Sequence, residues 1–87
     1  MANVFSGTAT TSDTTLTTDQ PCKEFYVKNT GSEGLRVNVD ALHGTDFDTL
    51  AGGDTEYYAA TTAAGIQVVT VKTDSSTTTY TAGITAK

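Results

Sequence analysis

The sequence has few of the side chains that most often build catalytic and metal sites. Its 87 residues include one cysteine, one histidine, one proline and no tryptophan. Because Cys22 is alone, neither an intrachain disulfide nor a cysteine-based zinc cluster can form. A metal site with several histidines is excluded, and any histidine-dependent triad would rest on His43. These shortages weigh against an enzyme.

Basic residues are scarce as well. Five Lys and Arg stand against ten Asp and Glu, so the net charge is −5, which opposes binding along a phosphate backbone. The first residues contain neither the basic region nor the apolar run of a signal peptide, and no apolar stretch approaches the roughly 20 residues that cross a bilayer. We therefore expect a chain made in the cytoplasm that binds neither nucleic acid nor membrane.

Threonine is abundant, with twenty of the 87 residues. Its branched side chain loses freedom in helices and suits the half-exposed surface of a sheet, so the composition predicts strands. A chain of this length has room for one core and buries roughly 60 to 65% of its unfolded surface. Residues 1–87 are therefore expected to form one domain, with oligomerisation as a supplement to its stability.

Alternating side chains mark the clearest strands. Apolar and polar residues alternate over residues 24–28 and again over 35–39, and a turn sequence at 29–32 separates the two runs, which predicts a hairpin. Residues 66–72 are the most apolar stretch and should form a central strand. Within it, the adjacent Val68 and Val69 indicate either a bulge or a strand that is buried on both faces.

Other segments complete an all-β pattern. Strands are predicted around residues 55–62 and 79–85, whereas residues 41–50 are expected to be a loop that plugs one end of the core. About seven short strands, with turns roughly every 8 to 12 residues, predict a small antiparallel β-sandwich. Either a jelly roll or an immunoglobulin-like sandwich fits this pattern.

Two segments contain candidate partner-binding residues. Residues 1–20 have few large apolar side chains, and they form either thin edge strands or an arm that orders on a partner, with Val4 and Phe5 as its anchors. In a regular strand, Tyr57 and Tyr58 point to opposite faces, so one packs inward and the other is exposed. An exposed tyrosine makes a good protein or carbohydrate contact.

No catalytic, cofactor-binding or metal-binding residue is predicted. We expect His43 to be a loop side chain that hydrogen-bonds to backbone, and Cys22 to be a small packed residue. The acidic residues between Asp40 and Glu56 do not have the spacing of a calcium-binding EF-hand loop, and a solvated acidic rim is the simpler interpretation. The sequence around Ser32, Gly-Ser-Glu-Gly, is not a nucleophile elbow.

A family resemblance rests on residues 24–86. The run Val-Asp-Ala-Leu-His-Gly at 39–44, the Ala-Gly-Gly-Asp turn at 51–54 and the strand at 65–72 precede a Thr-rich final strand. This order resembles small β-sandwich virion proteins of tailed phages, of the capsid decoration or cement type. The resemblance implies a non-enzymatic virion protein that binds and stabilises the assembled shell. Its partner would be the major capsid protein or another virion protein, and it would form a homo-oligomer, with a trimer favoured.

Two alternatives belong to other classes of protein. A carbohydrate-binding or adhesive module, for example on a phage tail or fibre, would use Tyr57 or Tyr58 as a stacking platform. A threonine surface that binds ice or packs into fibres is suggested by residues 77–79 and Thr81, but no regular Thr-x-Thr repeat supports it elsewhere.

Overall fold

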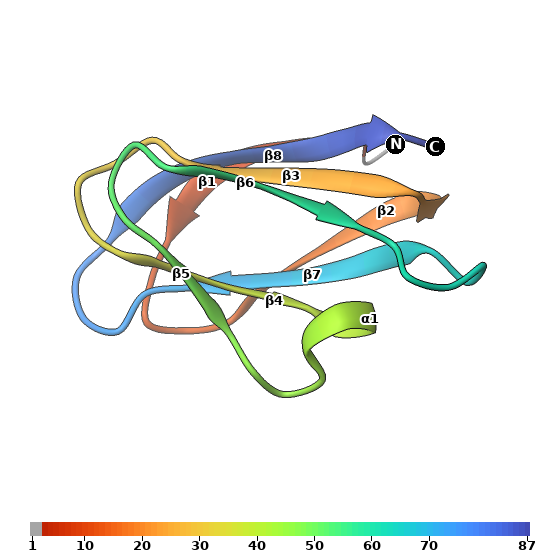
Figure 1. Cartoon of the computed structure of the whole chain (residues 1–87). Helices are drawn as coiled ribbons and strands as arrows, with labels where there is room; N and C mark the ends of the chain where they lie inside the picture. The colour runs from red at the N-terminus through yellow and green to blue at the C-terminus, as the bar shows by residue number, and fades with distance from the viewer. Residues whose placement is uncertain (1–2) are drawn as a thin grey trace.

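The computed structural model describes residues 3–87 as two antiparallel four-stranded sheets packed face to face (Figure 1). The strands are β1 (Val4–Ala9), β2 (Thr14–Cys22), β3 (Glu24–Asn29), β4 (Leu35–Val39), β5 (Asp48–Leu50), β6 (Thr55–Ala59), β7 (Ile66–Lys72) and β8 (Thr78–Ala86). A single turn of helix, α1 (Asp40–His43), follows β4. The predicted all-β sandwich is therefore confirmed.

The strands pair in a nested manner. β1 pairs with β8, β2 with β7, β3 with β6 and β4 with β5, all of them antiparallel. One sheet has the order β1-β8-β3-β6 and the other has the order β2-β7-β4-β5. Two equal four-stranded sheets with this pairing form a jelly roll, whereas an immunoglobulin domain distributes its strands differently.

The predicted hairpin between residues 24–28 and 35–39 is wrong. β3 pairs with β6 and β8, whereas β4 lies in the opposite sheet between β5 and β7. The intervening residues therefore cross from one sheet to the other. The two alternating runs face each other across the core, and alternation shows which side of a strand is buried but not which strand lies beside it.

The core lies between the two sheets. The largest fully buried apolar side chains come from β3, β4 and β7, as expected from their alternating or apolar sequences; they are Phe25, Val27, Leu35, Val37, Val39, Ile66, Val69 and Val71. Each such side chain contributes about 1.5 to 3 kcal/mol by leaving water. β7 is a central strand, as predicted.

Two local expectations need correction. The strand at Val68 is not buried on both faces, because Val68 is 36% exposed while Val69 fills the core. The alternative of a bulge agrees with the structure, since the pairing of β2 with β7 shifts register beside Val68, between the pairs Thr17–Val68 and Cys22–Ile66. Residues 41–50 are not a simple loop, since they contain most of α1 and all of β5, and Leu50 is buried.

The N-terminal segment forms one edge of each sheet. β1 lies at an edge of the first sheet and β2 at an edge of the second. Ala9, Leu16 and Thr18 are buried in the core. Residues 4–20 are thus integrated into the sandwich and do not project as an arm. The first two residues of the predicted arm lie outside the described residues.

Candidate functional site

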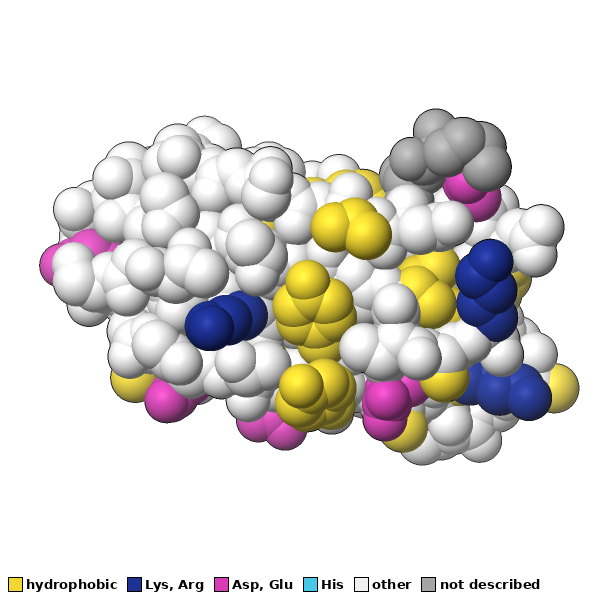
Figure 2. All heavy atoms as spheres, turned by 90° about the horizontal axis from the view of Figure 1, so that it is seen from above, with side chains coloured by type: hydrophobic (Ala, Val, Ile, Leu, Met, Phe, Trp, Pro, Cys, Tyr) yellow, Lys and Arg dark blue, Asp and Glu magenta, His cyan; other side chains and the backbone are white. Residues whose placement is uncertain are grey.

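The outer face of the β1-β8-β3-β6 sheet has a row of apolar side chains that crosses the strands. The strand register places Val4 opposite Gly83, Gly83 opposite Tyr26, and Tyr26 opposite Tyr57. We call Val4, Tyr26 and Tyr57 the aromatic row. Figure 2 looks onto this face and shows hydrophobic side chains in a band across it. Three segments that are distant in sequence therefore form one patch.

Alternation along each strand puts these side chains outside. In β3, Phe25 and Val27 are buried, so Tyr26 between them points to the outer face. In β6, Tyr58 is 5% exposed and Tyr57 is 60% exposed, which confirms that the two tyrosines point in opposite directions. The structure thus presents one tyrosine from each of two neighbouring strands.

Gly83 leaves room for the ring of Tyr26. A Cβ atom at position 83 would lie 3.2 Å from Cε1 of Tyr26 and 2.9 Å from the backbone oxygen of Asn3. The ring of Tyr26 also lies near that of Tyr57, with centroids 6.4 Å apart and planes inclined by 42°. This spacing is typical of favourable aromatic pairs. The glycine therefore helps to join Val4 and the two tyrosines into one surface.

Polar groups surround the aromatic row. Glu24 and Lys28 lie on the same face of β3 as Tyr26, on either side of it. The hydroxyl of Thr85 donates a hydrogen bond of 2.6 Å to Oε1 of Glu24. Single exposed apolar residues are common on proteins, but an apolar patch with a polar rim is typical of a binding surface.

The predicted partner-binding residues separate into two pairs. Val4, which is 75% exposed, and Tyr57 lie in the aromatic row. Phe5 points inward, with its ring centroid 6.1 Å from that of Phe25, and Tyr58 is buried, so neither can serve as a principal contact. Tyr26 was not among the predicted binding residues, although its position between Phe25 and Val27, both buried, is a signal that could have identified it.

His43 has a structural environment. Its Nδ1 accepts a hydrogen bond of 2.9 Å from the backbone nitrogen of Val39, which confirms the predicted bond to backbone. Its Nε2 lies 3.5 Å from Oδ2 of Asp48, and its ring meets the ring of Tyr58 edge-on, with centroids 5.4 Å apart. Because both ring nitrogens have protein neighbours, His43 fastens α1 to β4 and β5.

The buried reactive groups are held in their protonated forms. Burial, together with the nearby charge of Asp48, raises the pKa of the Tyr58 hydroxyl. Burial also raises the pKa of the Cys22 thiol, which disfavours the nucleophilic thiolate. Within residues 3–87, no three His, Cys, Asp or Glu side chains converge in a way that could hold a metal ion. In the same residues, no helix is long and apolar enough to span a membrane.

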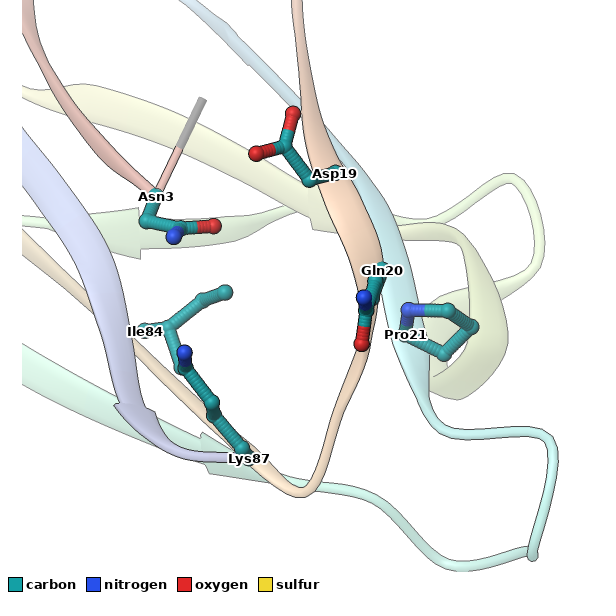
Figure 3. Close-up of a pocket in the computed structure, with 6 residues that line it drawn as sticks. All are labelled: Asn3, Asp19, Gln20, Pro21, Ile84 and Lys87. Carbon is teal, nitrogen blue, oxygen red and sulfur yellow. The ribbon is translucent and has the colours of Figure 1, made fainter. Parts of the chain in front are cut away.

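Two hollows of the surface lie at the end of the sandwich where β2 leads into β3, and a third lies at the opposite end, lined by residues 33–34 and 73–75. The first has a volume of about 100 Å³. Asn3, Ile84 and Lys87 line it on one side, and Asp19, Gln20 and Pro21 line it on the other (Figure 3). It is smaller than the roughly 300 to 1,000 Å³ of ordinary small-molecule sites. A shallower hollow of about 410 Å³ lies near Cys22 and Lys23. Cys22 is 2% exposed there and burial raises the pKa of its thiol, so this hollow does not present a thiolate nucleophile.

The aromatic row is therefore the best candidate for a functional surface in the described part of the chain. No family model, curated protein or solved structure matches the sequence or the fold of this chain.

Proposed function

We propose that the chain is a non-enzymatic binding protein that uses the aromatic row to contact another protein. The observation that supports this is the register-aligned placement of Val4, Tyr26 and Tyr57 on the outer face of a rigid sheet. Tyrosine provides a large contact area at a low cost in side-chain entropy and is enriched among the residues that dominate binding energy. A preformed sheet adds little further ordering cost.

The partner that we propose is the major capsid protein or another virion protein. This choice comes from the resemblance of residues 24–86 to phage decoration proteins, and it places the chain in the virion after synthesis in the host cytoplasm. The jelly roll is compatible with the role, because this fold occurs in viral capsid proteins, but it also occurs in lectins. Many copies on a repetitive shell can stabilise it even when each contact is weak.

Sedimentation with purified phage particles that lack the protein tests this proposal. The wild-type chain should bind them at a saturating copy number, and Tyr57→Ser and Tyr26→Ser should each weaken binding at least tenfold, as expected for residues that dominate an interface. Val68→Ser is a matched control, because Val68 is exposed on the opposite sheet. Unchanged binding by both tyrosine variants contradicts the proposed surface.

One observation also favours a carbohydrate-binding module. Tyr26 and Tyr57 form an adjacent pair next to Glu24, Lys28 and threonine hydroxyls, and such a pair can stack on a sugar ring while the polar groups bind its hydroxyls. A glycan array separates the two functions. Saturable glycan binding that Tyr26→Ser abolishes, without any binding to particles, supports the carbohydrate function.

A further inference from the structure

The strands at the sheet edges differ in their protection against further pairing. Natural edge strands are usually protected by charge, proline, bulges or shortness. β2 contains Asp19, Pro21 and a register irregularity, and β5 has three residues, one of them charged. β6 has Glu56 on the same side as the buried Tyr58. β1 has none of these features and pairs regularly with β8 over its six residues.

The free edge of β1 presents a regular set of backbone groups. The backbone oxygen of Asn3 accepts a hydrogen bond of 3.0 Å from the nitrogen of Ile84, so the backbone groups of Asn3 face β8. Successive residues of a strand direct these groups to alternate sides. Val4, Ser6 and Thr8 therefore direct theirs away from β8, and β1 has no second neighbour in its sheet.

We propose that β1 pairs with β1 of a second copy, antiparallel, about a two-fold axis that passes through Ser6. Ser6 then lies opposite Ser6 of the second copy, and Val4 lies opposite Thr8 of the second copy. Every outward N–H and C=O of these three residues gains a partner in the ladder. A two-fold axis makes this contact self-complementary, so the same strand serves both copies.

Other registers pair fewer of the outward-facing backbone groups of β1. An axis through Gly7 or Phe5 also pairs outward-facing residues with each other, but it leaves Val4 or Thr8, respectively, without a partner within β1. An axis between two residues would pair outer-face side chains with inner-face ones and break the pleat of the sheet. The register through Ser6 is the one in which Val4, Ser6 and Thr8 all pair with one another.

Charge does not oppose a second copy at this edge. The chain has a net charge of −5, which repels other copies in general, but residues 1–12 contain no charged side chain. Like charges opposite each other would destabilise a strand pair, and none arises here. The dimer joins the two outer faces into one sheet with an aromatic row on each side of the axis. The inference stands independently of what the aromatic row binds.

Disulfide formation at single cysteines tests the register. In the proposed pair, the Cα atoms of the two Ser6 residues are about 5.5 Å apart, which suits a disulfide. The two Thr8 residues are four positions out of register and lie about 14 Å apart. Under mild oxidation, Ser6→Cys should form a covalent dimer and Thr8→Cys should not. Native Cys22 is 2% exposed and does not interfere. Cross-linking of Thr8→Cys as readily as Ser6→Cys overturns the register.

Proline at the same position tests the dimer itself. Because the N–H of Ser6 points away from β8, Ser6→Pro should leave β1 paired within its own chain but block the second copy. We expect sedimentation equilibrium to show that Ser6→Pro raises the dimer dissociation constant at least tenfold, whereas Ser6→Thr leaves it within about twofold. A wild-type chain that stays monomeric up to about 1 mM overturns the proposal.

Discussion

At the scale of single residues, Asn29 joins three parts of one end of the sandwich, namely the loop after β3, the strand β5 and the start of β8. Its Nδ2 donates to the backbone oxygens of Glu33, at 2.6 Å, and Leu50, at 2.9 Å. Its Oδ1 accepts hydrogen bonds from the backbone nitrogen of Gly31 and the hydroxyl of Thr78. The side chain is fully buried, so each bond satisfies a group that water cannot reach. This residue holds the connection that crosses between the sheets.

Asn29→Ala should therefore destabilise the fold strongly. It leaves several buried polar groups without partners, and we expect a loss of about 3 kcal/mol in the free energy of unfolding, measured by urea denaturation. Thr30→Ala is the matched control, since Thr30 is exposed and its hydroxyl donates to that of Thr79, which is also on the surface, and it should cost less than about 1 kcal/mol. Similar losses for the two variants would show that Asn29 does not hold the crossing.

We expect the folded chain to lose stability at alkaline pH because Tyr58 is buried. Burial raises the pKa of Tyr58, and also that of Tyr80, above the ordinary value of about 10. The unfolded chain therefore releases these protons at a lower pH than the folded chain. Their contribution to stability is fully present below about pH 10 and is lost as the pH rises toward the folded-state values.

Tyr58→Phe should move the alkaline unfolding midpoint, followed by circular dichroism, to higher pH. Within residues 3–87 the buried Tyr58 hydroxyl has no hydrogen-bond partner, so its removal should change stability at pH 7 by less than about 1 kcal/mol or increase it. Tyr57→Phe, on the exposed face, should leave the alkaline midpoint in place. An unchanged midpoint in Tyr58→Phe contradicts the role of the buried hydroxyl.

At the scale of strands and turns, the sequence was most informative where one side of a strand is buried. The alternation around Phe25 and Val27 and the apolar run at 66–72 identified β3 and β7 with nearly correct bounds. α1 and β5 were missed because a single helical turn and a three-residue strand are too short to show a period. The hairpin prediction was wrong because a local turn sequence cannot distinguish a hairpin from a connection that crosses between sheets.

The candidate site was only partly predictable for a related reason. The opposite directions of Tyr57 and Tyr58 follow from neighbouring positions in one strand. The aromatic row instead depends on the register of four strands, which brings Val4, Tyr26 and Tyr57 together across Gly83. Such register is set by packing between distant segments, and no pattern within one strand contains it.

Deletion of residues 1–20 should unfold the domain. Under the arm hypothesis, the truncated chain would stay folded and lose only its binding. In the structure, the deletion removes β1 and most of β2, takes an edge strand from each sheet, and removes the buried Ala9, Leu16 and Thr18. We expect no cooperative thermal transition by calorimetry. A cooperative transition near the wild-type temperature would support the arm hypothesis instead.

At the scale of the whole molecule, the symmetry of the oligomer determines how many aromatic rows it presents. A two-fold pairing of β1 predicts a solution mass twice that of the 9.0 kDa chain. The trimer that the family resemblance implies requires another contact, because an antiparallel pair of identical strands accommodates two copies. Light scattering distinguishes these states, and a trimeric mass at all concentrations contradicts the β1 dimer.

A dimer also predicts avidity on a repetitive partner. If both aromatic rows engage one particle, Ser6→Pro should weaken binding to particles by 10²-fold or more while each row keeps its own affinity. The single-site affinity can be compared by using isolated partner subunits, for which wild type and Ser6→Pro should agree within about twofold. An equal loss in both assays would show that the proline damages the face itself.

The nested pairing of the strands also determines the order in which the molecule can form. Leu35 of β4 meets Leu50 of β5 across an intervening segment of eight residues that includes α1, whereas Val4 of β1 must find Gly83 of β8 near the other end of the chain. Closing longer loops costs more entropy, and folds dominated by distant contacts form in milliseconds to seconds. We expect folding to proceed outward from β4 and β5, with β1 and β8 joining last. Since the aromatic row spans these late strands, only completely folded chains present it.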